Sequence, residues 1–307
     1  MNPFGALALS TLRGYARVAP TQRGGYRLAR LARRLVPRQQ WQNSFTIPGG
    51  AKFDLDLSTY PDCCMAVGIY ELDTLRLLRS LLGAGDHFVD CGANIGYFSF
   101  AAAACVGPTG RVDAFEPDPL NRARLEAHLA QNGSPANVHV HPVALTDHAG
   151  QATLYHPAQD GHNHGEASLF APAGVQSTPY TVTTARLDEM LDRPPRLIKM
   201  DIEGAELAAL KGMTRFLRGA NPPMLIIEHN PDSAAAAGHR SGDLLRFLQE
   251  CKPTYRAHWA AWRLSAAQSP DQIDATPRQG NFLYRADLVA ASPSRGAHVT
   301  SPPIARP

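Results

Sequence analysis

Residues 87–100 read HFVDCGANIGYFSF, and this stretch constrains the fold more than any other part of the chain. A short apolar segment that ends in Asp90 leads into a turn with Gly92 and Gly96, and an alanine-rich helical segment follows to about residue 104. A buried strand, a glycine turn and a helix in this order are typical of the nucleotide-binding edge of an α/β sheet. The stretch therefore predicts a parallel sheet with a ligand site at the end of this strand.

The rest of the chain repeats the same alternation of short apolar strands and amphipathic helices. Strand signals occur at RVDAFEP, VHVHPVAL, LIKMDIEG and MLIIEH, with helix signals between them, and weaker strands occur at TYRAHW and NFLYRA. Such alternation predicts parallel strands joined by helical crossovers. We expect an α/β fold with a doubly wound, mainly parallel, seven-stranded Rossmann-like sheet that has helices on both faces and an antiparallel last strand.

Composition and charge divide the chain into three predicted regions. At 307 residues with 44% hydrophobic content, the chain can bury a substantial core. We predict a basic helical leader at residues 1–52, the α/β domain at 53–290 with a substrate loop at about 156–180, and a disordered proline- and serine-rich tail at 291–307. Five cysteines without CxxC spacing indicate neither a disulfide framework nor a zinc site. The apolar runs are too short to span a bilayer, and we expect a cytoplasmic protein.

The leader carries the basic character of the chain. Nine arginines and lysines precede Asp54 and no acidic residue stands among them, although the net charge of the whole chain is only +3. Within it, YRLARLARRLV places leucines at helical spacing among arginines, which predicts a basic amphipathic helix. Residues 1–40 could rest on an anionic membrane or an acidic partner, or pack as a solvated helix on the domain. No basic stripe with interleaved aromatic residues indicates nucleic-acid binding.

The residues of the turn discriminate between nucleotide ligands. Asn94 occupies the position where a dinucleotide-binding turn has its second glycine, and Asp90 places a carboxylate at the strand end, so phosphate is disfavoured. No G-K-[ST] follows, which excludes a P-loop. A nucleoside with a cationic tail fits better, and S-adenosylmethionine is such a ligand. Gly92 would let the backbone approach its amino-acid part, and Glu116, twenty residues after Gly96, could accept hydrogen bonds from both ribose hydroxyls.

From Tyr70 to Glu228 the chain resembles the FkbM-type family of S-adenosylmethionine-dependent methyltransferases, within the class I methyltransferase fold. The resemblance rests on VDCGANIGYFS, VDAFEPDP, HPVALTDHAG, ARLDEML, LIKMDIEGAELAALKG and LIIEHN, in this order and spacing. It covers about half of the chain, and the leader and the tail lie outside it. The resemblance implies that the first turn holds the methionine part, that Glu116 holds the ribose, and that two residues after the third strand flank the adenine. Glu71 is a further candidate that could bind the ammonium, and the alternative is that it is a plain helix residue. The implied cofactor-binding residues are Glu71, Asp90, Gly92, Ala93, Asn94, Gly96, Glu116, Ala144 and Leu145.

Methyl transfer to a hydroxyl also needs a general base within hydrogen-bonding reach. Carboxyl ends of parallel strands are where that base should lie. We predict Asp201 and His229 as the pair closest to the methyl group, with Glu203 in support. The alternatives are that Glu203 and Glu206 only favour the N-terminus of the next helix, and that His229 is satisfied by the backbone.

A metal-free site is a better hypothesis than either of two possible metal sites. Asp201, Glu228 and His229 could bind Mg²⁺ and lower the pKa of the acceptor, but their spacing does not require it, and we predict no metal. The loop QDGHNHGEASLF has an H-x-H pair without further nearby ligands, which is a weak zinc signal. Coverage of a substrate is the better hypothesis for this loop, with His164 and Ser168 reaching the acceptor, although a plain surface loop is an equal alternative.

The sequence therefore predicts an S-adenosylmethionine-dependent O-methyltransferase that acts on a hydroxyl of a sugar, glycolipid or secondary metabolite. A small-molecule or glycan acceptor is the expected partner, and nucleic acid is not, because DIEG stands where an NPPY-like motif would follow the fourth strand. The alternative is a non-catalytic module of the same fold that holds the cofactor or a partner. An NAD-linked oxidoreductase is disfavoured by Asn94.

Overall fold

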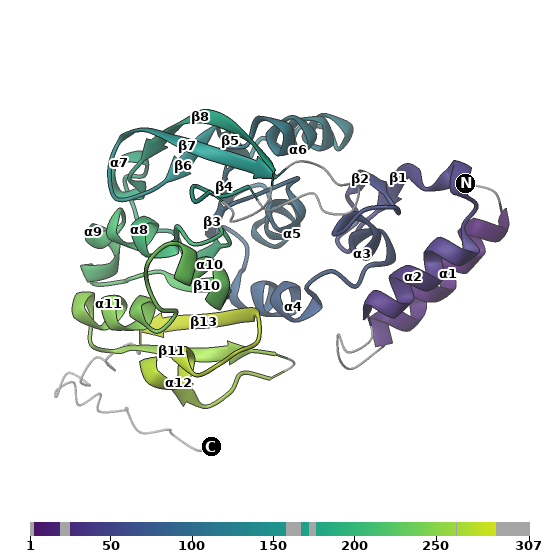
Figure 1. The fold of residues 1–307 in the computed structure, drawn as a ribbon. Helices are drawn as coiled ribbons and strands as arrows, with labels where there is room; N and C mark the ends of the chain where they lie inside the picture. Colours follow the sequence, from purple (N-terminus) through teal and green to yellow (C-terminus); the bar gives the residue numbers. More distant parts are fainter. Residues whose placement is uncertain (1–2, 19–24, 158–166, 172–175, 262, 287–307) are drawn as a thin grey trace, which may run out of the picture.

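A computed structural model of the chain describes residues 3–18, 25–157, 167–171, 176–261 and 263–286. A mixed sheet of eight strands forms its centre, with the spatial order β12-β11-β13-β10-β9-β3-β4-β5 (Figure 1). Strands β5, β4, β3, β9 and β10 pair in parallel, and β13 is antiparallel to both of its neighbours. The strands are β3 (His87–Cys91), β4 (Arg111–Phe115), β5 (Val138–His141), β9 (Leu197–Met200), β10 (Met224–His229), β11 (Tyr255–Ala260), β12 (Ala267–Gln268) and β13 (Gly280–Ala286).

This topology confirms the predicted doubly wound fold with an antiparallel last strand. Strand order reverses between β3 and β9, which is the switch point where such sheets bind ligands. The eighth strand, β12, is a two-residue addition at the edge. The prediction of seven strands missed it because two residues give no periodic signal.

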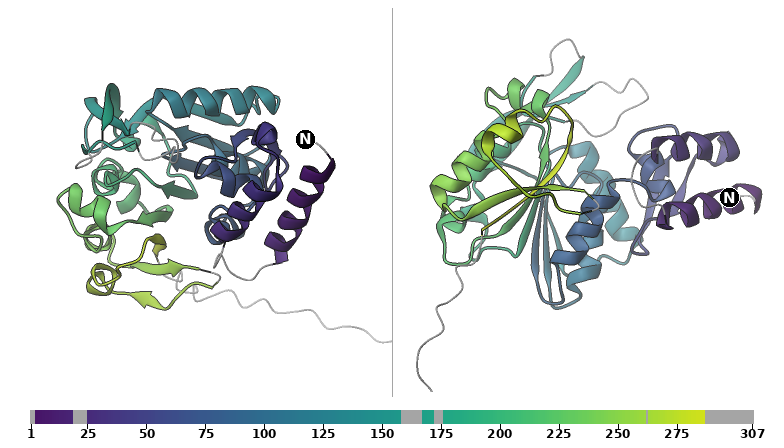
Figure 2. Two further views of the ribbon diagram at one scale, coloured as in Figure 1. Left: turned by 45° about the vertical axis from the view of Figure 1, so that its right-hand side comes forward. Right: turned by 90° about the horizontal axis from the view of Figure 1, so that it is seen from below.

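Apolar side chains on both faces explain why the central strands are buried. Successive residues of a strand point to opposite faces, so Phe88 joins the core on one side of the sheet and Val89 the core on the other. Helices cover both faces, as Figure 2 shows. One core includes α4 (Leu72–Leu81), α5 (Tyr97–Val106) and α6 (Pro119–Gln131), and the other includes α7 (Leu187–Met190), α8 (Glu206–Lys211), α9 (Thr214–Arg218), α11 (Asp243–Cys251) and α12 (Pro270–Asp274).

A second, three-stranded sheet of order β6-β8-β7 lies beside the central sheet. Its strands are β6 (Val143–Leu145), β7 (Gly150–Pro157) and β8 (Ser177–Ala185). The short helix α10 (Pro231–Ala236) does not belong to this sheet and follows β10 of the central sheet. The segment VHVHPVAL is therefore two strands and not one, because β5 pairs with β4 and β6 pairs with β8. Pro142, which has no backbone N–H to donate to a ladder, separates them.

The N-terminal region packs onto the same core as α4 and α5. It contains α1 (Pro3–Val18), α2 (Gly25–Leu35), the short 3₁₀ helix η1 (Arg38–Gln40), the hairpin of β1 (Gln42–Thr46) and β2 (Lys52–Asp56), and α3 (Asp62–Val67). Buried residues of α1, α2 and α3 belong to one cluster with Phe88 of the central sheet. The predicted leader boundary at residue 52 falls inside the β1–β2 hairpin. That boundary and the tail at 291–307, which lies outside the described residues, remain predictions. No described helix is long and apolar enough to span a membrane.

Candidate active site

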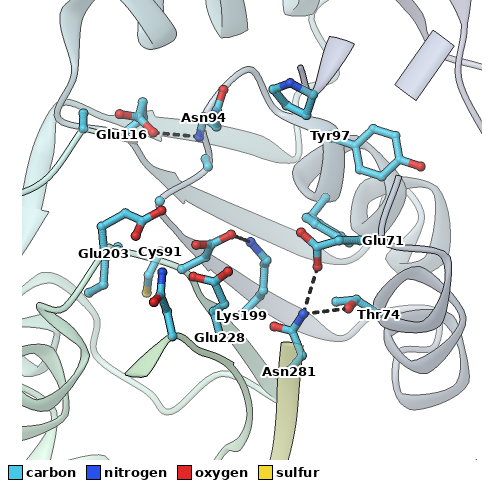
Figure 3. A pocket seen from close by; sticks show the side chains of 18 of the residues that line it. Glu71, Thr74, Cys91, Asn94, Tyr97, Glu116, Lys199, Glu203, Glu228 and Asn281 are labelled. Atoms are coloured by element: carbon cyan, nitrogen blue, oxygen red, sulfur yellow. Dashed lines mark hydrogen bonds and ion pairs between the residues drawn. The ribbon is translucent and has the colours of Figure 1, made fainter. Parts of the chain in front are cut away.

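A cavity of about 800 Å³ opens at the carboxyl ends of β3, β4, β9 and β10. It is lined by polar side chains from several strands and by apolar side chains from β6 and α5. Figure 3 shows Glu116 and Asn94 on one side of it and Glu71 and Asn281 on the other. The position at the switch point of the sheet is the one predicted from the sequence.

The glycine turn after β3 is shaped by packing as much as by any ligand. Gly92 has φ of +78°, and a Cβ there would lie 2.0 Å from the carbonyl oxygen of Asp201. The N–H groups of Gly92 and Ala93 both donate to the carbonyl of Phe115, each at 3.0 Å. The missing side chain of Gly92 makes room for the backbone that follows β9, and the predicted close approach of a ligand here stays a prediction. Gly92, Ala93 and Asn94 nevertheless line the cavity, as predicted.

Two predicted residues of the turn, Asp90 and Gly96, are not among the residues that line the cavity. Asp90 is fully buried and accepts a hydrogen bond of 2.6 Å from the hydroxyl of Ser99 on α5. Burial raises the pKa of Asp90 to about 6. Gly96 has φ of +94° and packs against Leu125 of α6. Neither residue reaches the cavity in this structure, and the role predicted for both residues in cofactor binding stays a prediction.

Glu116 is held at the end of β4 by two backbone donors. Its Oε2 accepts from the N–H of Asn94 at 2.6 Å, and its Oε1 accepts from the N–H of Asp118 at 2.9 Å. Burial raises the pKa of this carboxyl to about 8. Each carboxylate oxygen can accept further hydrogen bonds, so the group is oriented and still able to bind a donor. This is the position that the sequence predicted for a ribose-binding acid.

An apolar wall stands beside Glu116. Ala144 and Leu145 of β6 are buried and line the cavity, together with Phe115 and Leu154. Both predicted residues are therefore in place for an aromatic base, even though they belong to a separate sheet.

A buried lysine organises the charges on the opposite side. The side chain of Lys199 is 3% exposed, and its Nζ lies 2.9 Å from Oδ2 of Asp201 and 4.6 Å from the ring centre of Phe98. The charges of Asp201, Glu71 and Asp90 raise the pKa of Lys199 although burial acts to lower it. The sequence analysis missed this residue. One signal could have indicated it: a charged lysine inside LIKM, a four-residue strand that is otherwise apolar.

Asp201 and Glu228 are neighbouring carboxyl groups that influence each other's pKa. Burial and the neighbouring charge of Asp201 raise the pKa of Glu228 to about 11. Burial alone would raise the pKa of Asp201 as well, but the charge of Lys199 and hydrogen bonds from Lys199 and Glu228 lower it. At neutral pH, Glu228 therefore carries the proton and Asp201 is ionised. Asp201 lines the cavity, as predicted.

Glu203 completes a group of three carboxylates. Its Oε2 accepts from the hydroxyl of Ser233 at 3.0 Å, and one oxygen each of Asp201, Glu203 and Glu228 lie within 4.8 Å of one another. Oxygen ligands at such spacing suit a divalent cation, although acidic groups often gather without one. The absence of a metal stays a prediction.

His229 is not beside Asp201, and this corrects the predicted catalytic pair. The imidazole is buried, its Nε2 lies 2.9 Å from the carbonyl oxygen of Thr276, and it packs against the rings of Trp259 and Phe282. Consecutive strand residues point to opposite sides, so Glu228 faces the cavity and His229 faces away. Burial also lowers the pKa of His229.

Ser168 contacts the site indirectly. Its hydroxyl donates to the backbone carbonyl of Glu203 at 2.8 Å, and its neighbours Ala167 and Leu169 line the cavity. The structure thus places this part of the predicted substrate loop at the cavity. His164, which we predicted to reach the acceptor, lies outside the described residues, as does the rest of the H-x-H pair.

Glu71 lines the cavity from the start of α4. Its carboxylate accepts from Nδ2 of Asn281 at 3.0 Å, and burial raises its pKa. Asn281 comes from β13, far along the chain, and the sequence analysis did not predict it. Other lining residues that it missed are Tyr60, Tyr70, Tyr97, Trp259 and Arg278.

Known proteins with similar sequences fit this architecture. Residues 90–255 match the sequence model of the methyltransferase FkbM domain, which is more than half of the chain. The hexuronic acid methyltransferase AglP of Haloferax volcanii is 29% identical over 191 residues, 59% of this chain and 69% of that protein.

Two solved structures are similar to part of this chain at low sequence identity. The methyltransferase FkbM of Methylobacillus flagellatus KT has 19% identity and a TM-score of 0.42, over 70% of this chain and 59% of that one. An S-adenosylmethionine-dependent O-methyltransferase of Thermotoga maritima has 14% identity and a TM-score of 0.39, over 71% and 66%. On the evidence of its sequence match and its strand order, this chain belongs to the family of FkbM methyltransferases.

Proposed function

We propose that this protein is an S-adenosylmethionine-dependent O-methyltransferase whose acceptor is a sugar hydroxyl, free or within a glycolipid. One observation carries the proposal: a single cavity contains a carboxyl group held by two backbone N–H donors, Glu116, and two neighbouring carboxyl groups beside a buried lysine, Asp201 and Glu228. The similarity to a protein named hexuronic acid methyltransferase supports a sugar as the acceptor class.

The residues present suit S-adenosylmethionine. The cavity volume is within the range of small-molecule sites, about 300 to 1,000 Å³. Glu116 would accept hydrogen bonds from the ribose, Ala144 and Leu145 would contact the adenine, and Glu71 would attract the ammonium. Two buried atoms of lining residues, Oε2 of Glu228 and Oδ1 of Asn281, have no hydrogen-bond partner among the described residues and are available to a ligand.

When bound, S-adenosylmethionine supplies an electrophilic methyl group: the acceptor oxygen bonds to the methyl carbon while the carbon–sulfur bond breaks, and the sulfur keeps the electron pair. The protein contributes positioning and proton removal. Asp201 lines the cavity, its pKa is lowered by Lys199 although burial acts to raise it, and it would take the hydroxyl proton of the acceptor. Lys199 holds Asp201 in place, and Glu228 stabilises its charge by donating a hydrogen bond.

A binding module without turnover is the second candidate. It would use the same Glu116 and the same apolar wall, but it would not need the charges around Asp201. The cost of burying Lys199, Asp201 and Glu228 together favours the enzyme, because charged groups are rarely buried without a purpose in the site.

The test is methyl transfer from methyl-labelled S-adenosylmethionine to a panel of hexuronic acid glycosides, neutral sugars and lipid-linked glycans, with mass spectrometry of the product. We expect transfer by the wild type and by Asp192→Asn, an exposed carboxylate that serves as the control. Asp201→Asn should lower the rate by about 10² to 10⁴. If the protein binds the cofactor but transfers no methyl group to any acceptor of the panel, the binding-module hypothesis replaces the enzyme. Parallel reactions with EDTA test whether the three carboxylates need a metal.

A further inference from the structure

We propose that the outer surface of α1 and α2 is a docking site for an anionic phospholipid membrane. The two helices contact each other and lie at one end of the molecule, with α2 also packed on α3 (Figures 1 and 2). Their inner sides are already used, because Leu9, Leu12, Ala29, Ala32 and Val36 are buried in the shared core. The outer sides carry side chains that are exposed within the described part of the chain, such as Leu7, Tyr15 and Leu31. This inference does not rest on the proposed function.

The outer side of α2 and the turn after it carry unneutralised positive charge. Arg27, Arg30, Arg34 and Arg38 are exposed, and their spacing places the first three on one helix face. Ion pairs between these arginines and a carboxylate do not occur within the described part of the chain. The first acidic residue of the whole sequence is Asp54, so no local sequence neighbour neutralises them either. Such a surface attracts a negatively charged partner.

The arginines also form a depression that suits phosphate. It is lined by Arg30, Arg33, Arg34, Val36, Arg38 and Trp41. The guanidinium carbons of Arg33 and Arg38 lie 5.4 and 5.6 Å from the ring centre of Trp41, so the aromatic ring restrains both. Guanidinium groups fixed in this way present several N–H donors to the oxygens of a phosphate group.

Exposed apolar side chains indicate a membrane as the source of that phosphate. Leu7 is 67% exposed, Tyr15 is 59% exposed, and Leu31 is 40% exposed among the arginines of α2. Leu7 and Tyr15 are eight residues apart on α1 and therefore share one helix face. Leucine and tyrosine beside arginines are typical of helices that lie in the headgroup region of a bilayer. A nucleic acid would explain the arginines but not the exposed leucines.

The experiment is sedimentation of the full chain with vesicles, either of phosphatidylcholine alone or with phosphatidylglycerol added. We expect binding to the anionic vesicles only, and weaker binding as salt screens the charges. Arg30→Glu combined with Arg34→Glu should lower the partition coefficient at least about thirtyfold, since each basic residue near an anionic surface contributes about a factor of five. The matched control is Arg193→Glu with Arg196→Glu, two exposed arginines outside the N-terminal region.

A third variant, Leu7→Ser with Leu31→Ser, tests the apolar contribution and should weaken binding while leaving the charge unchanged. Circular dichroism and thermal melting of each variant report whether the fold is kept. Equal binding to neutral and anionic vesicles, unchanged binding of the Arg30 and Arg34 variant, or binding to soluble heparin and RNA without binding to vesicles would each overturn the proposal.

Discussion

Replacement of Lys199 by methionine tests the charge balance of the site. The lysine side chain is 3% exposed and that of its partner Asp201 is 21% exposed, so the ion pair is largely buried. Removal of one partner from a buried pair costs about 3 to 5 kcal/mol, because the other charge is left uncompensated. Asp201 faces the cavity, which favours the lower end of that range. We therefore expect Lys199→Met to lose about 3 kcal/mol of unfolding free energy at pH 8.

The loss should depend on pH with a definite sign. Without the lysine, burial raises the folded-state pKa of Asp201 above its unfolded value, and the pKa values of Asp90 and Glu71, which burial already raises, rise further. Groups with a raised folded pKa stabilise the protein below the unfolded pKa, and that stability is lost as the pH rises through the folded pKa. The deficit of the variant should hence be smaller at pH 5 than at pH 8.

Urea unfolding of the wild type, Lys199→Met and Lys199→Met/Asp201→Asn at both pH values measures this directly. The double variant should recover part of the lost stability, because it removes both charges. Lys211→Met, at an exposed lysine of α8, is the control and should differ from the wild type by less than about 0.5 kcal/mol. If the single variant is less than about 1 kcal/mol less stable than the wild type at pH 8, the reasoning is refuted.

Three further predictions concern the cofactor side of the cavity. Glu116→Gln should weaken binding of S-adenosylhomocysteine by about 2 to 4 kcal/mol, roughly 30- to 1,000-fold in Kd, because hydrogen bonds to a charged acceptor are lost. Isothermal titration measures this, and Glu126→Gln, an exposed carboxylate on α6, should bind like the wild type. Because burial raises the pKa of Glu116 to about 8 and ribose hydroxyls would donate to its ionised form, affinity should rise from pH 6 to pH 8 and level off above that value; a flat profile would contradict the role of Glu116. Gly92→Ala places a Cβ 2.0 Å from a backbone oxygen, so it should cost at least about 2 kcal/mol in urea unfolding, and an unchanged midpoint would contradict the packing seen at this turn.

The main features of the fold could be predicted from local signals. Strands such as LIKM and MLIIEH are apolar on both faces, and glycine or helix signals follow them directly, so their parallel pairing follows from general rules. The polar residues at the carboxyl ends of these strands could be located for the same reason. Glu116 and Asp201 were found because each directly follows such a strand.

What the sequence could not supply was the direction of individual side chains. At the end of β10, either Glu228 or His229 could face the cavity, and only the register with β9 and β13 decides between them. Asp90 shows a related difficulty, because it pairs in register with the cavity residue Lys199 and yet hydrogen-bonds to Ser99 of α5, which no local pattern indicates. Asn281 reaches Glu71 across 210 positions of the chain, and no local pattern predicts such a contact.

Titration of the purified full chain with S-adenosylhomocysteine tests the central claim most directly. We predict saturable binding at one site per chain with a Kd in the micromolar range, accompanied by a rise in melting temperature as expected for a ligand of the folded state. A folded protein that gives neither heat of binding nor a shift in melting temperature would contradict the assignment of this cavity to S-adenosylmethionine.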